Sequence, residues 1–305
     1  MKKTITVFML AMLLATPLLA GGRGKSKSSL KGSYPVVLVH GILGFDDRQP
    51  LLGVVSYWGG MDDHLRSKGA PVLTPGLSAM NDDATRAAEL KPQVNYWMAA
   101  NNYRKVHLLA HSQGGSTSRF MTSNLGMAGK IASITTINSL HRGTPVGDIA
   151  LKALPDWLEP AVAVVINAFG RIIYGEKQDI LAMAEGMTTR YMNALNETTP
   201  NVSSVDYFSY GSRVTLPDPI QHPLMFLTFP ITALGGASYD MGTANDGIVP
   251  FSSMKWGKWK GEPDYRWYTT GVDHLQITNW AYSGELWYDV KGFYLKMARN
   301  AFNNQ

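Results

Sequence analysis

The chain has 305 residues, of which 45% are hydrophobic and 17% charged, a composition that suits one globular α/β domain with insertions or two small domains. It has no cysteine, which excludes disulfides, thiol catalysis and cysteine metal sites. The formal net charge of +5 comes from the first 31 residues, which hold six basic and no acidic side chains. The remaining residues carry 22 basic and 23 acidic side chains, so bulk charge gives no case for nucleic-acid binding.

The N-terminus has the pattern of a secretory signal peptide. Lys2 and Lys3 precede an apolar run from Ile5 to Leu14, and small residues follow. We expect residues 1–22 to be a signal peptide and the protein to be secreted or periplasmic. Residues 23–33, rich in glycine, serine and basic side chains, are typical of a flexible leader. The alternative is an N-terminal membrane anchor, although the apolar run is short for a spanning helix.

After the leader, apolar runs alternate with helical patterns. Residues 34–40 form a continuous apolar run, as expected for a strand buried on both faces, and residues 71–73 form a second, shorter strand. We expect one helix over residues 57–68 and another over residues 81–101, the second with a break near Pro92.

The next strand, over residues 106–111, runs directly into Ser112. Ala110 and Gly114 flank this serine at two positions before and after it, and a helix to about Asn124 follows. A serine between small residues at a tight strand-to-helix turn is the nucleophile elbow of α/β-hydrolases, where strand and helix pack too closely for larger side chains. The pattern predicts Ser112 as a nucleophile.

A loop earlier in the chain matches a second motif of α/β-hydrolases. The stretch His40–Gly44 has the form HG-x-x-G and follows the first strand. In α/β-hydrolases such a loop supplies one backbone N–H of the oxyanion hole, and the residue after the nucleophile supplies the other. The predicted oxyanion donors are therefore the N–H groups of Ile42 and Gln113.

The rest of the chain continues the alternation of strands and helices. We expect strands over residues 131–137 and 205–210, a proline-rich loop with little regular structure over residues 216–230, and a closing helix over residues 282–303. Strands that alternate with helices indicate a mostly parallel central sheet with helices on both faces.

One stretch does not follow this alternation of strands and helices. Residues 157–174 are strongly apolar with few charges and lie between strands, where a hydrolase carries its cap. We expect a helical lid insertion at about residues 148–186, with an apolar face that is exposed when the lid is open. A plain core helix is the alternative. The resulting organisation is a single α/β-hydrolase domain over residues 34–305 with this lid.

Serine is a weak nucleophile at its own pKa and needs a base within hydrogen-bonding reach. The order along α/β-hydrolases is serine, acid, histidine. Four of the seven histidines precede Ser112, His141 follows too early to leave room for an acid strand, and His222 lies in the proline-rich loop. His274, which follows a late strand, is the predicted base.

The acid must orient this base and stabilise its protonated form. Asp246 sits in an Asn-Asp-Gly turn before an apolar strand, a position that directs a carboxylate over the sheet edge. Asp240 is the main alternative and Asp264 another. Asp273 is adjacent to His274 along the chain, so we expect it to point away from that ring.

Taken together, these motifs make the chain resemble bacterial family I triacylglycerol lipases of the Pseudomonas–Burkholderia type. The resemblance covers the chain from about residue 34 to its end and implies Ser112 as nucleophile, Asp246 as acid, His274 as base, and Ile42 and Gln113 as oxyanion donors. The matching stretches are YPVVLVHGILGFD at residues 34–46, YWG at 57–59, AHSQGG at 110–115, SRF at 118–120, HRG at 141–143, ANDGIV at 244–249 and DHL at 273–275.

The chain also departs from that family. The family's elbow usually begins with glycine, where this chain has Ala110. Most members hold a calcium ion through acidic and amide side chains, and the corresponding positions here read Gln276, Trp280 and, by rough alignment, Thr228 or Phe229. Calcium prefers carboxylate and carbonyl oxygens. We therefore expect no metal and no other cofactor.

The expected function is hydrolysis of carboxylic esters by a secreted Ser-His-Asp enzyme, most of all as a triacylglycerol lipase. The expected partner is a lipid or ester substrate at an oil–water interface, and some relatives also need a foldase chaperone. A short-chain esterase or a polyester hydrolase on the same fold is the closest alternative. A non-catalytic lipid-binding protein is a further one, although such a module needs no complete set of catalytic motifs.

Overall fold

The computed structural model describes residues 29–42, 44, 56–151 and 180–305. The expected signal peptide (residues 1–22), most of the leader (23–33) and the middle of the expected lid (152–179) lie outside the described residues, as do Leu43 and residues 45–55. Within the described part of the chain, no helix has both the length and the apolar character needed to cross a membrane.

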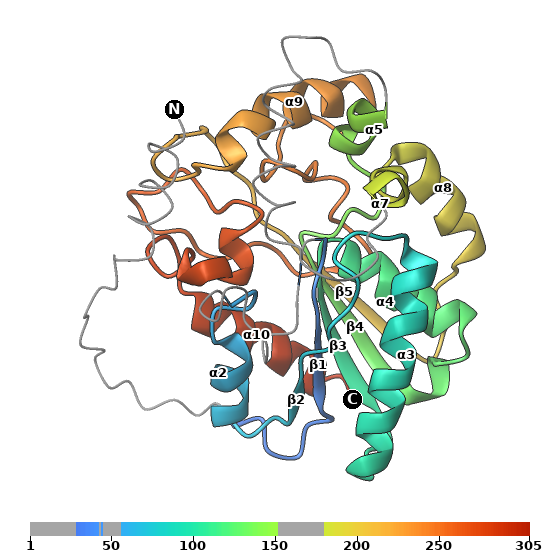
Figure 1. The fold of residues 1–305 in the computed structure, drawn as a ribbon. Helices are drawn as coiled ribbons and strands as arrows, with labels where there is room; N and C mark the ends of the chain where they lie inside the picture. The colour runs from blue at the N-terminus through green and yellow to red at the C-terminus, as the bar shows by residue number, and fades with distance from the viewer. Residues whose placement is uncertain (1–28, 43, 45–55, 152–179) are drawn as a thin grey trace, which may run out of the picture.

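A six-stranded parallel sheet forms the centre of the molecule, with the order β2-β1-β3-β4-β5-β6 (Figure 1). The strands β1, β3, β4 and β5 lie in the interior of the sheet and are almost wholly buried, and β1 is accordingly a continuous apolar run in the sequence. The six strands are β1 (Val36–Val39), β2 (Val72–Leu73), β3 (Val106–His111), β4 (Ile131–Ile137), β5 (Asp206–Tyr210) and β6 (Lys258–Trp259).

Helices cover both faces of this sheet, as the sequence predicts. Because successive side chains of a strand point to opposite faces, β1 serves two cores. Val36 and Leu38 pack in one core with the helices α2 (Met61–Ser67) and α10 (Val290–Phe302). Val37 and Val39 pack in the other core, which includes buried residues of α3 (Asp83–Ala100) and α4 (Gln113–Asn124).

Four further helices lie beyond one end of the sheet (Figure 1). The helix α5 contacts α7, α8 and α9, and these contacts hold the group together. Their bounds are α5 Pro145–Leu151, α7 Ile180–Gly186, α8 Thr189–Thr198 and α9 Met225–Ser238. The described parts of the predicted lid region at 148–186 are the end of α5 and α7; the lid itself stays a prediction.

Three expectations about helices were wrong. The stretch at 216–230 is not all loop, because α9 begins at Met225 and continues through Pro230. Gly235 leaves room on α9 for Pro145 of α5, and this close packing together with the burial of Ile231 offsets the cost of an interior proline.

Pro92 likewise lies inside a continuous α3 rather than at a break, because Leu90, Val94 and Met98 share one buried face. The closing helix begins at Val290 instead of residue 282. Two short 3₁₀ turns, Gln276–Thr278 and Trp280–Tyr282, come before it.

Candidate active site

Ser112 lies at the turn between β3 and α4 in a conformation that side chains seldom adopt. Its backbone angles are φ 55° and ψ −130°, outside the main allowed regions for a residue with a Cβ. The Ser112 amide donates to the carbonyl of Ile137 at the end of the neighbouring strand, at 3.0 Å. The turn therefore presents the serine hydroxyl beyond the carboxyl ends of the strands.

The small residues around Ser112 have a direct steric reason. A Cβ on Gly114 would lie 2.5 Å from the Val39 carbonyl oxygen and 2.7 Å from that of His40, both backbone atoms. Ala110 is fully buried in β3, paired with Val39 on one side and Thr136 on the other. The fold accepts a methyl group at position 110 and leaves no space for one at position 114.

The structure brings together the three residues predicted as a triad. His274 Nε2 lies 3.0 Å from Ser112 Oγ, and His274 Nδ1 lies 2.6 Å from Asp246 Oδ2. All three side chains are buried, with exposed fractions of 4% for Ser112, 6% for His274 and 0% for Asp246. Ser112 and His274 are 162 positions apart in the sequence, so their contact depends entirely on the tertiary fold.

Asp246 is held by four hydrogen bonds to its carboxylate. Oδ1 accepts from the amides of Ile248 at 2.9 Å and Val249 at 2.7 Å. Oδ2 accepts from Asn138 Nδ2 at 2.7 Å in addition to His274 Nδ1. This arrangement satisfies a fully buried carboxylate and fixes its orientation toward the histidine.

The other candidate acids lie elsewhere. Asp240 and Asp264 are exposed, and neither contacts His274. The Asp273 carboxylate accepts from His222 Nδ1 at 3.1 Å and not from the neighbouring His274. The prediction that it points away from that ring is therefore confirmed.

The loop predicted to supply the oxyanion donor packs against the nucleophile. A Cβ on Gly41 would lie 2.5 Å from Ser112 Cβ, so only glycine allows this approach. The Gly44 amide donates to the Gly41 carbonyl at 3.2 Å and closes a turn around Ile42. Among the described residues, no backbone carbonyl accepts from the Ile42 amide.

Gln113 is the first residue of α4, so its amide has no acceptor within the helix. Its side chain is fully buried and donates from Nε2 to the Asn81 carbonyl at 2.8 Å, so it has no role in the proposed chemistry. Both predicted oxyanion donors therefore belong to segments that flank Ser112, and each is predicted for its amide rather than its side chain.

Two buried side chains that the sequence did not single out for the site hold the His40–Gly44 loop by hydrogen bonds to its backbone. Arg86 Nη2 donates to the carbonyls of His40 at 2.7 Å and Gly41 at 3.2 Å. Tyr57 Oη accepts from the Gly41 amide at 2.9 Å and shares a hydrogen bond with His111 Nδ1 at 2.6 Å. The carbonyls of His40 and Gly41 are thus hydrogen-bonded to the Arg86 guanidinium.

A second buried histidine lies next to the predicted base. The rings of His111 and His274 lie 4.6 Å apart. Burial, reinforced by the nearby His274, holds the pKa of His111 well below its usual range, so His111 is neutral at pH 7. At the start of α3, burial raises the pKa of Asp83 to about 6, and hydrogen bonds from the Ser116 and Thr117 hydroxyls of α4 offset part of this rise.

Reasoning from the sequence missed Asn138, Arg86 and the His222–Asp273 pair. Asn138 directly follows β4, the strand beside the elbow strand, and a polar residue at that strand end could have drawn attention. Arg86 and His222 carry no such signal. Within the described part of the chain, no group of three histidine or acidic side chains is placed to hold a metal ion.

Known proteins resemble this chain in both sequence and fold. Residues 34–218 match the family described as the alpha/beta hydrolase fold. The sequence is 30% identical to a triacylglycerol lipase of Vibrio cholerae over 267 residues, which is 81% of this chain and 80% of that protein. It is 33% identical to a triacylglycerol lipase of Burkholderia plantarii over 221 residues, or 66% of this chain but 60% of that protein.

With a triacylglycerol lipase of Pseudarthrobacter phenanthrenivorans the identity is 36% over 55% of this chain, which is again only 54% of that protein. Solved structures share the fold at lower identity. Lipase 1 from Pelosinus fermentans aligns with a TM-score of 0.62 and 21% identity over 88% of this chain and 98% of that chain. The Staphylococcus hyicus lipase aligns with a TM-score of 0.63 and 18% identity over 93% and 98% of the two chains.

Proposed function

Because the chain belongs to the α/β-hydrolase fold family and is similar to bacterial triacylglycerol lipases, we propose that it hydrolyses carboxylic esters and that its substrates are acylglycerols. The observation that carries this proposal is the buried chain of contacts from Ser112 Oγ through the His274 ring to Asp246 Oδ2. A base within 3.0 Å of a serine, oriented by an acid, is what serine needs to act as a nucleophile.

The proposed reaction has two halves. Ser112 Oγ attacks the ester carbonyl carbon while His274 Nε2 takes the hydroxyl proton, and Asp246 stabilises the resulting imidazolium. The amides of Ile42 and Gln113 bind the oxyanion of the tetrahedral intermediate. As the C–O bond to the alcohol breaks, His274 returns its proton to the leaving alcohol. Water then attacks the acyl-enzyme by the same route, which releases the carboxylic acid and restores Ser112.

Exposed apolar side chains on α9 and just before it support an acylglycerol substrate at an oil–water interface. The segment from residue 219 through α9 to residue 239 carries no lysine, arginine, aspartate or glutamate. Ile220 is 82% exposed and Leu234 71% exposed, and Phe226 and Leu227 are partly exposed as well. Such apolar exposure is costly in water and is relieved on a lipid surface. The N-terminal pattern of residues 1–22 supports export to a compartment where such substrates occur.

The mechanism is tested with Ser112→Ala and, as a matched control, Ser203→Ala on an exposed turn. We expect Ser112→Ala to lose hydrolysis of p-nitrophenyl esters by at least about 10³-fold, because no nucleophile remains, while circular dichroism stays unchanged. The control keeps full activity. Hydrolysis by Ser112→Ala at the wild-type rate would refute the mechanism.

The substrate class is tested with esters of increasing chain length. A lipase gains activity when tributyrin exceeds its solubility limit, and it cleaves emulsified long-chain acylglycerols. Activity confined to soluble acetate and butyrate esters would contradict the acylglycerol proposal and favour a short-chain esterase on the same fold.

A further inference from the structure

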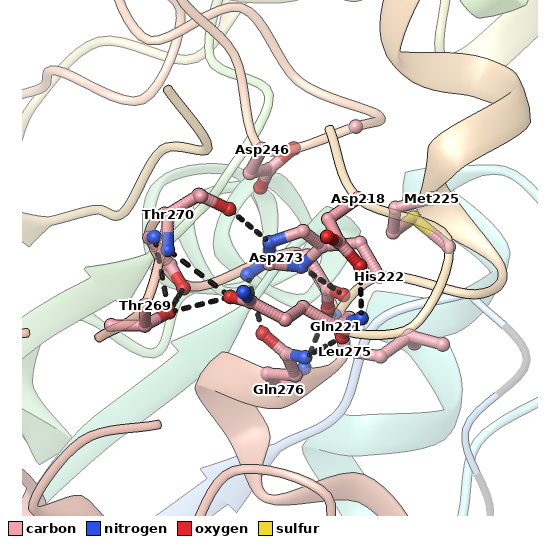
Figure 2. A network of polar contacts seen from close by, with 12 residues as sticks. Asp218, Gln221, His222, Met225, Asp246, Thr269, Thr270, Asp273, Leu275 and Gln276 are labelled. Carbon is pink, nitrogen blue, oxygen red and sulfur yellow. Dashed lines mark hydrogen bonds and ion pairs between the residues drawn. The ribbon is translucent and has the colours of Figure 1, made fainter. Parts of the chain in front are cut away.

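A second buried polar network lies beside the proposed base and has no part in the reaction scheme above (Figure 2). At its centre is His222, which comes shortly before α9. His222 Nδ1 lies 3.1 Å from Asp273 Oδ2, and His222 Nε2 lies 3.1 Å from Thr270 Oγ1. The exposed fractions are 1% for His222 and 3% for Asp273. A carboxylate only accepts hydrogen bonds, so Nδ1 carries the proton in this contact.

The other oxygen of Asp273 closes the turn that carries His274. Asp273 Oδ1 accepts from the amides of Leu275 and Gln276, each at 2.9 Å. Gln276 Oε1 accepts in return from the Asp273 amide at 3.1 Å. The residues on both sides of His274 are therefore tied to one carboxylate, and that carboxylate is tied to His222.

Gln221 also joins the segment before α9 to the loop that carries His274. Its Oε1 accepts from the Thr270 amide and from Thr269 Oγ1, both at 3.1 Å, and its carbonyl accepts from Gln276 Nε2 (Figure 2). Residues 218–222, ahead of α9, are thus joined side by side to residues 269–276, the loop of the proposed base. Outside this network, the backbone of His274 itself is held by its amide, which donates to the Asp246 carbonyl at 3.0 Å.

We propose that His222 is a positioning residue for ester hydrolysis, which holds the His274 loop in register with Ser112 and Asp246 through Asp273. This inference rests on the proposed function. His274 has to meet Ser112 Oγ and Asp246 Oδ2 at the same time, and a displacement of about 1 Å is enough to cost roughly 10²-fold in rate. A buried anchor on the adjacent residue limits that displacement.

The resemblance to calcium-binding lipases bears on the same loop, and the residues present do not fit a calcium ion. Both oxygens of Asp273 already accept hydrogen bonds. Gln276 uses its amide oxygen and its amide nitrogen within the network. Hydrogen bonds of the Asp273 and Gln276 side chains, most of them to backbone groups, therefore hold this loop, and no step in the reaction scheme involves a metal.

The test compares His222→Ala with His222→Asn, whose Nδ2 can take the place of the ring Nδ1. The matched control is His107→Ala. His107 is equally buried and hydrogen-bonded, at 2.8 Å to Ser133 Oγ, but it lies in β3 at the opposite end from Ser112. For each variant, kcat and KM on p-nitrophenyl butyrate, the melting temperature and the rate of Ser112 labelling by a fluorophosphonate are measured.

We expect His222→Ala to lower kcat at least about tenfold with KM within about twofold, and to slow fluorophosphonate labelling in parallel while labelling still reaches one per chain. His222→Asn recovers most of the activity. His107→Ala loses stability to a similar extent and keeps kcat within about twofold. If His222→Ala does not fold, Thr270→Val, which removes only the partner of Nε2, takes its place with a smaller expected loss of kcat.

A loss of kcat in His222→Ala no larger than that in His107→Ala would overturn the positioning role, and so would a failure of His222→Asn to recover activity. Ser112→Ala separates the two proposals. If Ser112→Ala stays active, the proposed function itself fails. If Ser112→Ala is inactive and His222→Ala retains the wild-type kcat, only the role of His222 fails.

Discussion

Asn138 Nδ2 lies 2.7 Å from Asp246 Oδ2, the same carboxylate oxygen that His274 Nδ1 contacts. The amide also lies 2.8 Å from Ser212 Oγ, and Asn138 is fully buried. Its backbone has φ 48°, in the left-handed region that asparagine tolerates better than most residues. Asn138 therefore holds the proposed acid at the oxygen that orients the base.

Removing this amide should weaken catalysis more than stability. A hydrogen bond to a charged group is worth about 1.5–3 kcal/mol, so Asn138→Gly, which accepts the positive φ, should lower kcat about 10- to 100-fold. Asn138→Ala should lower it equally and also lower the melting temperature further, because alanine is strained at this φ. Ser212→Ala serves as the control. Wild-type kcat in Asn138→Gly would contradict the role.

Arg86 offers a test of the loop that is proposed to supply an oxyanion donor. It is fully buried and donates to the carbonyls of both His40 and Gly41. Arg86→Lys should lower kcat at least about tenfold, because the single ammonium cannot reproduce the planar fork of the guanidinium. The measurements are kcat and urea unfolding. Arg66→Lys on α2, a partly exposed arginine paired with Asp62, should leave kcat unchanged, and an equal loss in both variants would argue against the prediction.

Gly114 should be intolerant of a methyl group. In Gly114→Ala the new Cβ would meet the backbone oxygens of Val39 and His40, which belong to the sheet and its loop and cannot yield easily. We expect a destabilisation of about 1–3 kcal/mol and loss of activity. At Gly129, by contrast, a Cβ meets nothing within 4 Å. Gly129→Ala should therefore match the wild type in both urea unfolding and kcat.

Asp83 makes stability depend on pH in a predictable direction. Burial raises its pKa to about 6 in the folded protein, above the value of about 3.9 for an unfolded aspartate. The folded state therefore binds this proton more tightly, and the contribution of Asp83 to stability falls as pH rises from about 4 to about 6. Asp83→Asn removes that dependence.

Relative to the wild type, Asp83→Asn should gain about 2–3 kcal/mol of unfolding free energy between pH 4 and pH 7. Urea unfolding of both proteins across this range measures the difference. Burial lowers the pKa of His107 to about 4, so the contribution of His107 to stability rises with pH. This contribution cancels in the comparison, because the wild type and Asp83→Asn both contain His107. A difference that stays constant with pH would show that Asp83 does not titrate in this way.

Metal removal gives a further test. The polar groups of the loop that carries His274 form hydrogen bonds with one another and with Gln221. Activity should therefore be unchanged by EDTA and by added calcium. Hydrolysis of p-nitrophenyl butyrate and the melting temperature are both measured after exhaustive dialysis against chelator. Activity that is lost in chelator and restored by calcium would refute this expectation.

Much of the fold could be predicted from the sequence because it is encoded locally. A strand buried on both faces is expected to be rich in apolar residues, and β1, with the sequence VVLV, is a continuous apolar run. The helix α9 could not be predicted, because Pro230 and its neighbours signal a loop. Its packing on α5 through Gly235 and Pro145 outweighs that local signal.

The sequence by itself determined the conformation of the elbow and the order in which serine, acid and histidine occur, because short-range sterics and chain order carry that information. Only the tertiary structure decided what holds those groups in place. Asn138 reaches Asp246 across 108 positions and Arg86 reaches His40 across 46, while His222 meets Asp273 across 51. Such contacts depend on the strand order of the sheet and on which buried polar groups the fold brings within hydrogen-bonding distance. Neither can be predicted from a local pattern along the chain.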